Sequence, residues 1–314
     1  MRKLLGLFLA IFLLSLAYDA HCQLNRKAIK KNNRRISSFR GKKSHFGKEK
    51  RYNAVGFSLN ALNYYGDLAP RPSRFSTDIS FTRPGIGISL THRFGPRYSV
   101  TGSFMYGTLS GSDHDSADPS DENAAARYKR NLSFRNRIKE LSVVASLDLF
   151  ENQATYISRV KWTPYAYLGV AFFLHNPQAK APDFQVDGVT PLAEAGEWVD
   201  LQPLGTEGQH ANLSETDVNF GTKPYKKLQV SIPFGLGARF RINEVMDISG
   251  EIGFRYLFTD YIDDVSKNYI DLGHFGNDEL AKAMSYRSSE LAEVKSQLVP
   301  ELSSVDGKTY MLLP

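Results

Sequence analysis

The chain has a single cysteine, Cys22, among its 314 residues, and this cysteine lies in an apolar N-terminal segment. If that segment is removed on export, neither disulfides nor a cysteine metal site can support the fold. Long hydrophobic runs are also missing, because beyond the N-terminus no stretch approaches the roughly 18 apolar residues that a membrane-spanning helix needs. A bundle of membrane helices is therefore excluded, whereas membrane strands, in which every second residue is polar, are not.

Residues 1–22 have the features of a secretory signal peptide. Two basic residues precede an apolar core from Leu4 to Ala17, which is too short to cross a membrane as a helix. Cleavage is expected after Ala20 or after Cys22. Lipidation of Cys22 is the less favoured alternative, because His21 occupies the position where a lipoprotein signal has a small residue. We predict an exported protein.

Acidic residues are almost absent from the next segment, residues 23–51, where Glu49 is the only one. Residues 26–51 carry a net charge of +11 and residues 52–314 a net charge of −6, so the high pI comes from this basic arm. Such a segment is expected to be disordered in isolation and attracted to anionic surfaces. It is either a solvated linker or an electrostatic contact with an acidic partner or lipid headgroups, and nucleic acid is not an expected partner of an exported chain. The candidate partner-binding residues are Arg26, Lys27, Lys30, Lys31, Arg34, Arg35, Arg40, Lys42 and Lys43.

Residues 52–314 contain repeated stretches in which apolar and polar residues alternate. The clearest is 227–261, where every second residue is apolar from Leu228 to Phe240 and again from Ile248 to Phe258. Successive side chains of a strand point to opposite faces, so each run predicts a strand with one apolar and one polar face. About ten residues per strand is the length that crosses a bilayer. Similar runs predict strands at 52–62, 85–94, 98–109, 138–150 and 162–174.

The connections between the predicted strands alternate in length. Outer-membrane barrels with up-and-down topology have short periplasmic turns and long external loops. We therefore predict an all-β fold, an eight-stranded antiparallel up-and-down transmembrane β-barrel in the outer membrane, with long extracellular loops and a basic periplasmic arm. The eighth strand has to come from Lys308–Leu313, because an open edge in lipid leaves backbone groups unsatisfied. The predicted long loops are 63–84, 110–137, 175–226 and 262–308.

Two local features modify this scheme. Pro233 lies within a predicted central strand and lacks the amide hydrogen that a sheet requires, so we expect a bulge or strong coiling there. In the last loop, Asn277 can cap a helix whose apolar residues recur near helical spacing up to Leu298. We expect the apolar side of this helix to pack on the barrel rim or on other loops.

The sequence contains no arrangement of residues that indicates catalysis or metal binding. A nucleophile–base arrangement, a phosphate-binding loop and a Cys/His cluster are all missing, so neither enzymatic activity nor a cofactor is expected. Asp260, Asp263 and Asp264 lack the spacing and the glycine of a calcium loop, and we expect them to be solvated or to cap a turn. The histidines of the long loops, His175, His210 and His274, lack metal-ligand spacing.

Charged residues also occur on the polar face of the predicted strands. An eight-stranded barrel is just wide enough inside for side chains, and a buried charge is tolerated only when it is paired. We expect a structural network that fills the interior in preference to proton or ion conduction. Its members are Glu140, Asp148, Arg239, Glu251 and Arg255.

Several stretches between residues 52 and 270 resemble known sequences. The most specific are LQPLGTEGQ within WVDLQPLGTEGQ at 198–209 and FTDYIDDV within FRYLFTDYIDDV at 254–265. The others are NYYGDL at 63–68, RNLSFRNRI at 130–138 followed by Glu140, PYAYLGVAFF at 164–173, NP at 176–177 and IPFGLG at 232–237.

Together these stretches resemble the PorG-like outer-membrane β-barrels of Bacteroidota. The resemblance implies a non-enzymatic eight-stranded barrel that belongs to the type IX secretion machinery and supports protein secretion, with gliding as a further role. It also implies contact with the subunits of a periplasmic ring. The alternative is a small surface-exposed barrel whose loops bind ligands or host molecules and that has no role in secretion. An outer-membrane enzyme ranks below both, because no serine pairs with His92, which falls on the lipid-facing side of its strand.

Overall fold

The computed structural model describes residues 30–31, 33, 46–68, 81–117, 120 and 122–291. The chain divides into two units, residues 1–51 and residues 52–314. In the first unit, Lys30 and Lys31 are exposed helical residues, and Lys48–Lys50 form the short 3-10 helix η1. The predicted signal peptide, the other candidate residues of the basic arm and the predicted eighth strand at Lys308–Leu313 lie outside the described residues.

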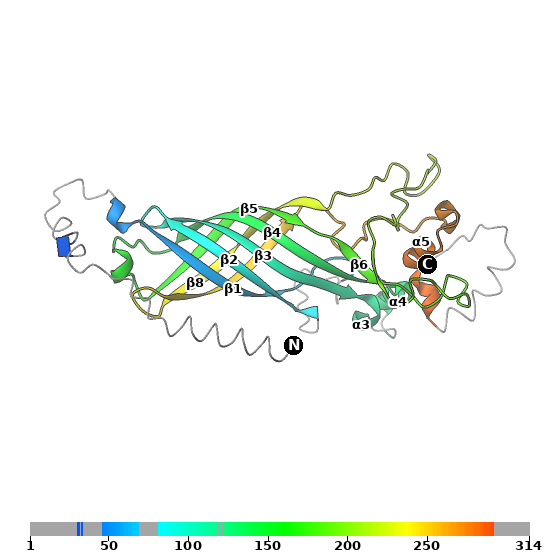
Figure 1. Ribbon diagram of the computed structural model, residues 1–314, viewed down its shortest axis with the longest axis horizontal. Coiled ribbons are helices and arrows are strands. Elements are labelled where there is room, and N and C mark those ends of the chain that lie inside the picture. Colours follow the sequence, from blue (N-terminus) through cyan, green and yellow to red (C-terminus); the bar gives the residue numbers. More distant parts are fainter. Residues whose placement is uncertain are drawn as a thin grey trace. The chain divides into compact units, whose positions relative to one another are not determined.

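The second unit is built on one antiparallel sheet in which each long strand pairs with the next along the chain (Figure 1). The predicted all-β antiparallel fold and its seven described long strands are confirmed. Two short strands, β6 (Pro177–Lys180) and β7 (Trp198–Asp200), extend the sheet beside the first residues of β4. The long strands, in sheet order, are β1 (Tyr52–Leu62), β2 (Arg83–Arg93), β3 (Tyr98–Ser112), β4 (Ser133–Asp148), β5 (Trp162–Leu174), β8 (Leu228–Arg241) and β9 (Asp247–Leu257).

Contacts between strands that are not neighbours show that the sheet is curled. Glu140 on β4 reaches Arg255 on β9, although β5 and β8 lie between these strands in the sheet. Asp148 on β4 likewise contacts Arg93 on β2. Such contacts are possible only across a concave face. The described residues thus form a curled half-barrel, and within them β1 and β9 are the edge strands.

The β3–β4 hairpin is longer than predicted. Pairing continues from Leu109↔Asn136 to Ser112↔Ser133 through residues that the sequence assigned to the loop 110–137. Arginine, asparagine and serine dominate there, and their polarity obscured the strand. Two short helices, α3 (Asp113–Ser116) and α4 (Glu122–Arg130), then connect the strands.

Pro233 does not cause a bulge, so the first of the two predicted alternatives was wrong. Pairing of β8 with β9 runs without a shift from Ser231↔Leu257 to Arg241↔Asp247. On the other side of β8 the pairs stop at Leu168↔Phe234 and resume in the same register at Ala171↔Ser231. The missing amide hydrogen is therefore accommodated by a local gap in the ladder, without an inserted residue.

The loops at the end of the sheet that carries α3 and α4 form a packed assembly of their own (Figure 1). One apolar cluster joins the loops to the strands through Phe134 and Phe173, which pack with Tyr64, Leu68 and Ile262. A second cluster lies within the loops and includes Met284 from α5 (Glu279–Ser285). Short 3-10 helices also occur among the described residues of this unit at η3 (Tyr156–Ser158), η4 (Leu272–Phe275) and η5 (Arg287–Glu290).

The predicted helix of the last loop is shorter than expected and begins one residue later. Asp278, rather than Asn277, is its N-cap, because the Asp278 carboxylate accepts a hydrogen bond from the Ala281 N–H (2.9 Å). Helix α5 ends at Ser285 and is followed by η5, and residues 292–298 lie outside the described residues. Its buried side contacts other loops, as predicted. In the described part of the chain, no helix has the length and apolar character that crossing a membrane requires.

Candidate functional site

The convex face of the sheet is apolar and exposed. On β1, Phe57 is 86 % exposed and Leu59 90 % exposed, and Ile252 on β9 is 74 % exposed. The same pattern holds on every long strand, for example at Leu141 and Val143 on β4. Contiguous apolar surface of this extent is rare on proteins that are surrounded by water and marks a surface that contacts another apolar phase or a partner.

Aromatic side chains lie at both ends of this apolar surface. At the end with the short turns, Phe94 stacks on Tyr98 with 6.2 Å between ring centroids, and Phe150 packs edge-on against Trp162 at 5.7 Å. At the end with the long loops, Tyr256 packs against Phe258 at 5.3 Å. All six rings are exposed. Amphipathic aromatic rings in such positions are typical of the boundary between an apolar and an aqueous phase.

The concave face holds the charged residues that the sequence placed on the polar side of the strands. Glu140 is almost fully buried and receives two hydrogen bonds from Arg255, at 2.6 Å from Nε and 2.9 Å from an Nη atom. This bidentate geometry fixes the guanidinium and neutralises the buried carboxylate. The pair connects β4 to β9 across the curl of the sheet.

A second charged cluster lies nearer the short turns. Asp148 is buried and forms ion pairs with Arg93 (3.3 Å) and Arg239 (3.7 Å). Arg93 also donates hydrogen bonds to the carbonyl oxygens of Gly95, Pro96 and Asn152. Strand β2, strand β4 and the two turns beside them are thereby held together.

Glu251, the remaining predicted member, pairs with a tyrosine. Its carboxylate accepts a hydrogen bond from the Tyr165 hydroxyl (2.5 Å). The Arg239 guanidinium lies over the Tyr165 ring, 4.9 Å from its centroid. The structure therefore brings Glu140 to Arg255 and Asp148 to Arg239. Glu251 is linked to the second cluster through Tyr165, and it also lies close enough to Arg255 to attract its charge. Sequence reasoning missed Tyr165 and Arg93, although both occupy the polar side of their strands.

Two stretches far apart in the sequence meet within the loop assembly. Asp264 of the 254–265 stretch accepts hydrogen bonds from Thr206 (2.6 Å), which belongs to the 198–209 stretch, and from the Tyr225 hydroxyl (2.5 Å). Next to it, Glu207 accepts the backbone N–H groups of Ser266 and Lys267, both at 2.8 Å. The adjacent Asp263 accepts a hydrogen bond from the Tyr64 hydroxyl.

Asp263 and Asp264 are buried, at 1 % and 3 % exposure, so the prediction that they are solvated was wrong. Asp263 does accept the Val265 N–H (3.3 Å), as a turn-capping residue would, and Asp260 is exposed. Burial raises the pKa of Asp263 and of Asp264 to about 7, since their hydrogen bonds to neutral groups only partly offset the loss of hydration. Burial also raises the pKa of Glu207.

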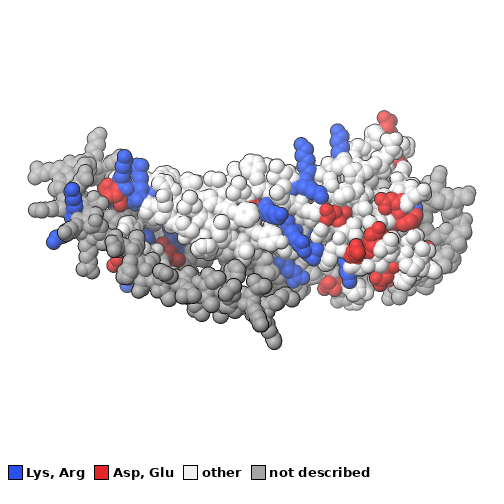
Figure 2. Space-filling view, in the orientation of Figure 1, with Lys and Arg blue, Asp and Glu red and all other residues white. Residues whose placement is uncertain are grey.

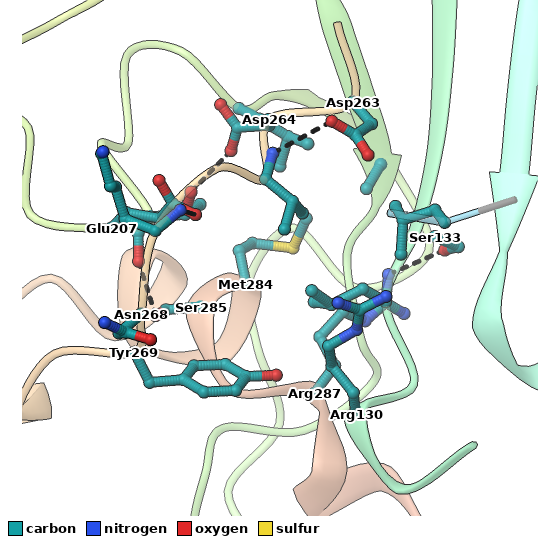
Figure 3. Close-up of a pocket in the computed structure, with 17 residues that line it drawn as sticks. Arg130, Ser133, Glu207, Asp263, Asp264, Asn268, Tyr269, Met284, Ser285 and Arg287 are labelled. Carbon is teal, nitrogen blue, oxygen red and sulfur yellow. Dashed lines mark hydrogen bonds between the residues drawn. The ribbon is translucent and has the colours of Figure 1, made fainter. Parts of the chain in front are cut away.

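A cavity of about 260 Å³ opens between these carboxyl groups and two arginines (Figure 3). Arg130 and Arg287 lie at one end of the cavity in Figure 3 and the two aspartates at another, with Met284 contributing apolar wall. Arg130 is held by the buried Asp113 at 2.7 Å, and Arg287 by Glu290 at 2.5 Å. Both arginines thus have acidic partners, whereas the hydrogen-bond partners of Asp263 and Asp264 are neutral. Lys267 also lines the cavity, so its wall combines three cationic side chains with three carboxyl groups and apolar surface, a lining that suits a small polar molecule.

The loop histidines do not converge on this cavity. His175 is buried against Tyr225, with 5.6 Å between ring centroids, and burial lowers its pKa to about 4. His210 bonds to the carbonyl of Gln202, and His274 lies 3.6 Å from Asp217. In the part of the chain that the structure describes, no group of three or more His, Cys, Asp or Glu side chains could hold a metal ion.

The fold defines an all-β protein with a curled antiparallel sheet, an apolar convex face and a charged concave face. A family model described as "Domain of unknown function (DUF6089)" matches residues 43–184, which is less than half of the chain. The match includes β1 to β5 but neither 198–209 nor 254–265, the two stretches that meet at Asp264. No curated protein and no solved structure matches the chain.

Proposed function

We propose that this protein is a non-enzymatic outer-membrane β-barrel that supports protein secretion as a component of the type IX machinery. The barrel has eight antiparallel strands, and its eighth strand comes from Lys308–Leu313. The N-terminal 22 residues direct export, and the basic arm and the short turns meet the subunits of a periplasmic ring. Partners are outer-membrane lipid and those subunits, and no nucleic acid is involved.

The observation that carries the membrane location is the exposed apolar convex face. A closed barrel in water would bury apolar residues inside, whereas here the inside positions hold the Glu140–Arg255 and Asp148–Arg93 pairs. That inversion is favourable only when the outside solvent is hydrocarbon. Long loops at one end and short turns at the other agree with the orientation expected for such a barrel.

The secretion role is supported by the resemblance of the 198–209 and 254–265 stretches to PorG-like barrels. Both stretches contribute to one buried hydrogen-bond network around Asp264, which explains why residues so far apart occur together in one pattern. A shared loop architecture is the reason to expect a shared role.

A deletion strain tests the proposed role. We expect type IX cargo to accumulate inside the cell and to return to the medium when the full-length gene is restored. A second strain that lacks only residues 26–51 tests the arm, because ring subunits should co-purify less well with the shortened barrel, and the remaining contact should weaken with salt. Unchanged recovery of ring subunits with the shortened barrel would rule out the arm as their binding site.

The second candidate function is a surface barrel whose loops bind a ligand. The specific observation in its favour is the 260 Å³ cavity beside Asp263 and Asp264. Normal cargo secretion in the deletion strain would favour this candidate over the first.

A further inference from the structure

The outward-facing side chains of β4 change from apolar to cationic between Leu141 and Lys139. From Leu141 to Leu147 its outward side chains are apolar and mostly exposed, and the next three outward positions are Lys139, Arg137 and Arg135. Alternate residues of a strand are about 6.6 Å apart, so these three cations form a row of roughly 13 Å that continues directly from the apolar surface. The exposed Lys180 on β6 lies beyond the row. Figure 2 shows Lys and Arg side chains gathered at this border of the uncharged strand surface.

Aromatic residues flank the row. Tyr106 on β3 is paired with Lys139 and is 38 % exposed. On the other side, the Arg135 guanidinium lies over the Trp198 ring, 3.6 Å from its centroid, and donates to Gln178 at 3.0 Å. Arg135 is thus held in place, with its charge at the surface of the strand.

The row has no acidic counterpart among the described residues. None of Arg135, Arg137 and Lys139 forms an ion pair there, and the Asp200 carboxylate is connected to Arg135 through Gln178. Arg137 lies close enough to Arg135 for the two like charges to interact unfavourably. Unneutralised cations at this spacing favour an anion that can contact several of them at once.

We propose that Arg135, Arg137 and Lys139 bind the phosphate groups of membrane lipids on the side of the long loops. The inference rests on the proposed membrane location. The continuity of the row with the apolar surface decides the source of the anion, because a lipid places its acyl chains against Leu141 and Val143 and its phosphate at Lys139. A soluble phosphate would gain nothing from that continuity. The aromatic rings of Tyr106 and Trp198 then lie at the depth of the headgroups.

The two tryptophans provide a direct test, because Trp198 adjoins the row and Trp162 lies at the opposite end of the apolar surface. The full chain with W162F, in which Trp198 is the only tryptophan, is folded into phosphatidylcholine vesicles that contain a minor fraction of phosphatidylglycerol. In one sample the phosphatidylglycerol carries bromine, which quenches tryptophan fluorescence, and in a second sample the phosphatidylcholine does. We expect brominated phosphatidylglycerol to quench Trp198 as if enriched by more than roughly five-fold over its bulk fraction, since each of the three cations attracts an anionic lipid by about this factor.

The variant R137Q/K139Q, made in the W162F chain, leaves the Arg135–Trp198 contact in place and should reduce this enrichment to no more than the roughly five-fold that the one remaining cation supplies. The matched control, R97Q/K161Q, removes two exposed cations at the turn end and should leave Trp198 unaffected. Equal enrichment in wild type and R137Q/K139Q would overturn the proposal, and so would its loss on addition of inorganic phosphate, which would indicate a site for a soluble anion. If neither brominated lipid quenches Trp198 in W162F or the two tryptophans of the unsubstituted chain, the membrane location itself is wrong, a result distinct from quenching without headgroup preference.

Discussion

On β1, Phe57 and Leu59 are 86 % and 90 % exposed, whereas in the loops Leu68 and Met284 are 1 % and 2 % exposed. The strands turn their apolar residues outward and enclose ion pairs, while the loops bury apolar residues as a water-soluble domain does. Apolar side chains are therefore exposed on the strands and buried in the loops of the same chain, and the change occurs at the ends of the strands. This difference is what the proposed membrane location requires, with strands and loops in different solvents, and each prediction below tests one side of it.

The largest effect of a single substitution is expected at the enclosed ion pair of the strands. R255M leaves the buried Glu140 carboxylate without its bidentate partner and should lower the free energy of unfolding by about 3–5 kcal/mol. Denaturant unfolding of the refolded protein measures the change. The double variant E140L/R255M removes both charges and should recover most of the loss. A cost below about 1 kcal/mol for R255M would mean that water solvates Glu140.

A somewhat smaller effect is expected on the convex face. V143R places a charge in the middle of the apolar surface of β4 and should cost about 2–4 kcal/mol in a bilayer. The matched control is V218R, at a loop position that is 70 % exposed, where the same change should cost less than about 0.5 kcal/mol. Unfolding from vesicles compares the two. Equal costs would show that strands and loops face the same solvent.

The loop assembly should lose stability as pH rises. The pKa of Asp263 and Asp264 is about 7 in the folded chain and near 3.8 when unfolded, so between these values the folded state holds more protons. Its stability is fully present below about pH 4 and falls by up to about 1.4 kcal/mol per pH unit and carboxyl until about pH 7.

Hydrogen exchange of the loop amides between pH 4 and pH 8, corrected for the intrinsic rate, measures this slope. D264N keeps an acceptor for Thr206 and removes one of the two main titrating groups, so it should remove about half of the slope. A stability that is constant or rises over this range would contradict the burial of these carboxyl groups.

The smallest effect is expected at the start of α5. D278A removes the hydrogen bond to the Ala281 N–H and should destabilise this helix by about 1 kcal/mol, without affecting the strands. Amide exchange at Ala281 is the measurement. N277A, at the residue that the sequence favoured as the cap, is the control and should change exchange little. The reverse result would show that Asn277 is the cap.

The strands were predictable because their signal is local. An alternation of period two depends only on neighbouring residues, and the bounds of β1 and β5 coincide with those predicted from it. The prediction failed at Ser110–Ser112 and Ser133–Arg137, where we interpreted polar residues as a loop. Phe134 is the only large apolar residue in these two segments, so they show no alternation, and only their pairing with each other identifies them as strands.

The loop site could not be predicted in the same way. Whether Asp264 is solvated depends on Thr206 and Tyr225, which are 58 and 39 residues away, and no local pattern reports that contact. The resemblance of both stretches to one family was the only signal that connected them. The polar side of the strands did indicate the pairs of Glu140 and Asp148, because the parity of a strand fixes which residues share a face.

Asn136 connects strand β4 to two of the loops by hydrogen bonds. Fully buried on β4, it donates to the carbonyl of Ile262 (2.6 Å) and accepts the N–H of Asn176 (2.9 Å). Ile262 lies in the loop that follows β9, and Asn176 lies in the loop that follows β5. A force applied to either loop has to break a buried hydrogen bond or pull on β4 itself. The two hydrogen bonds thus tie both loops to β4, so that a load on either loop is shared with a strand that the loop does not follow.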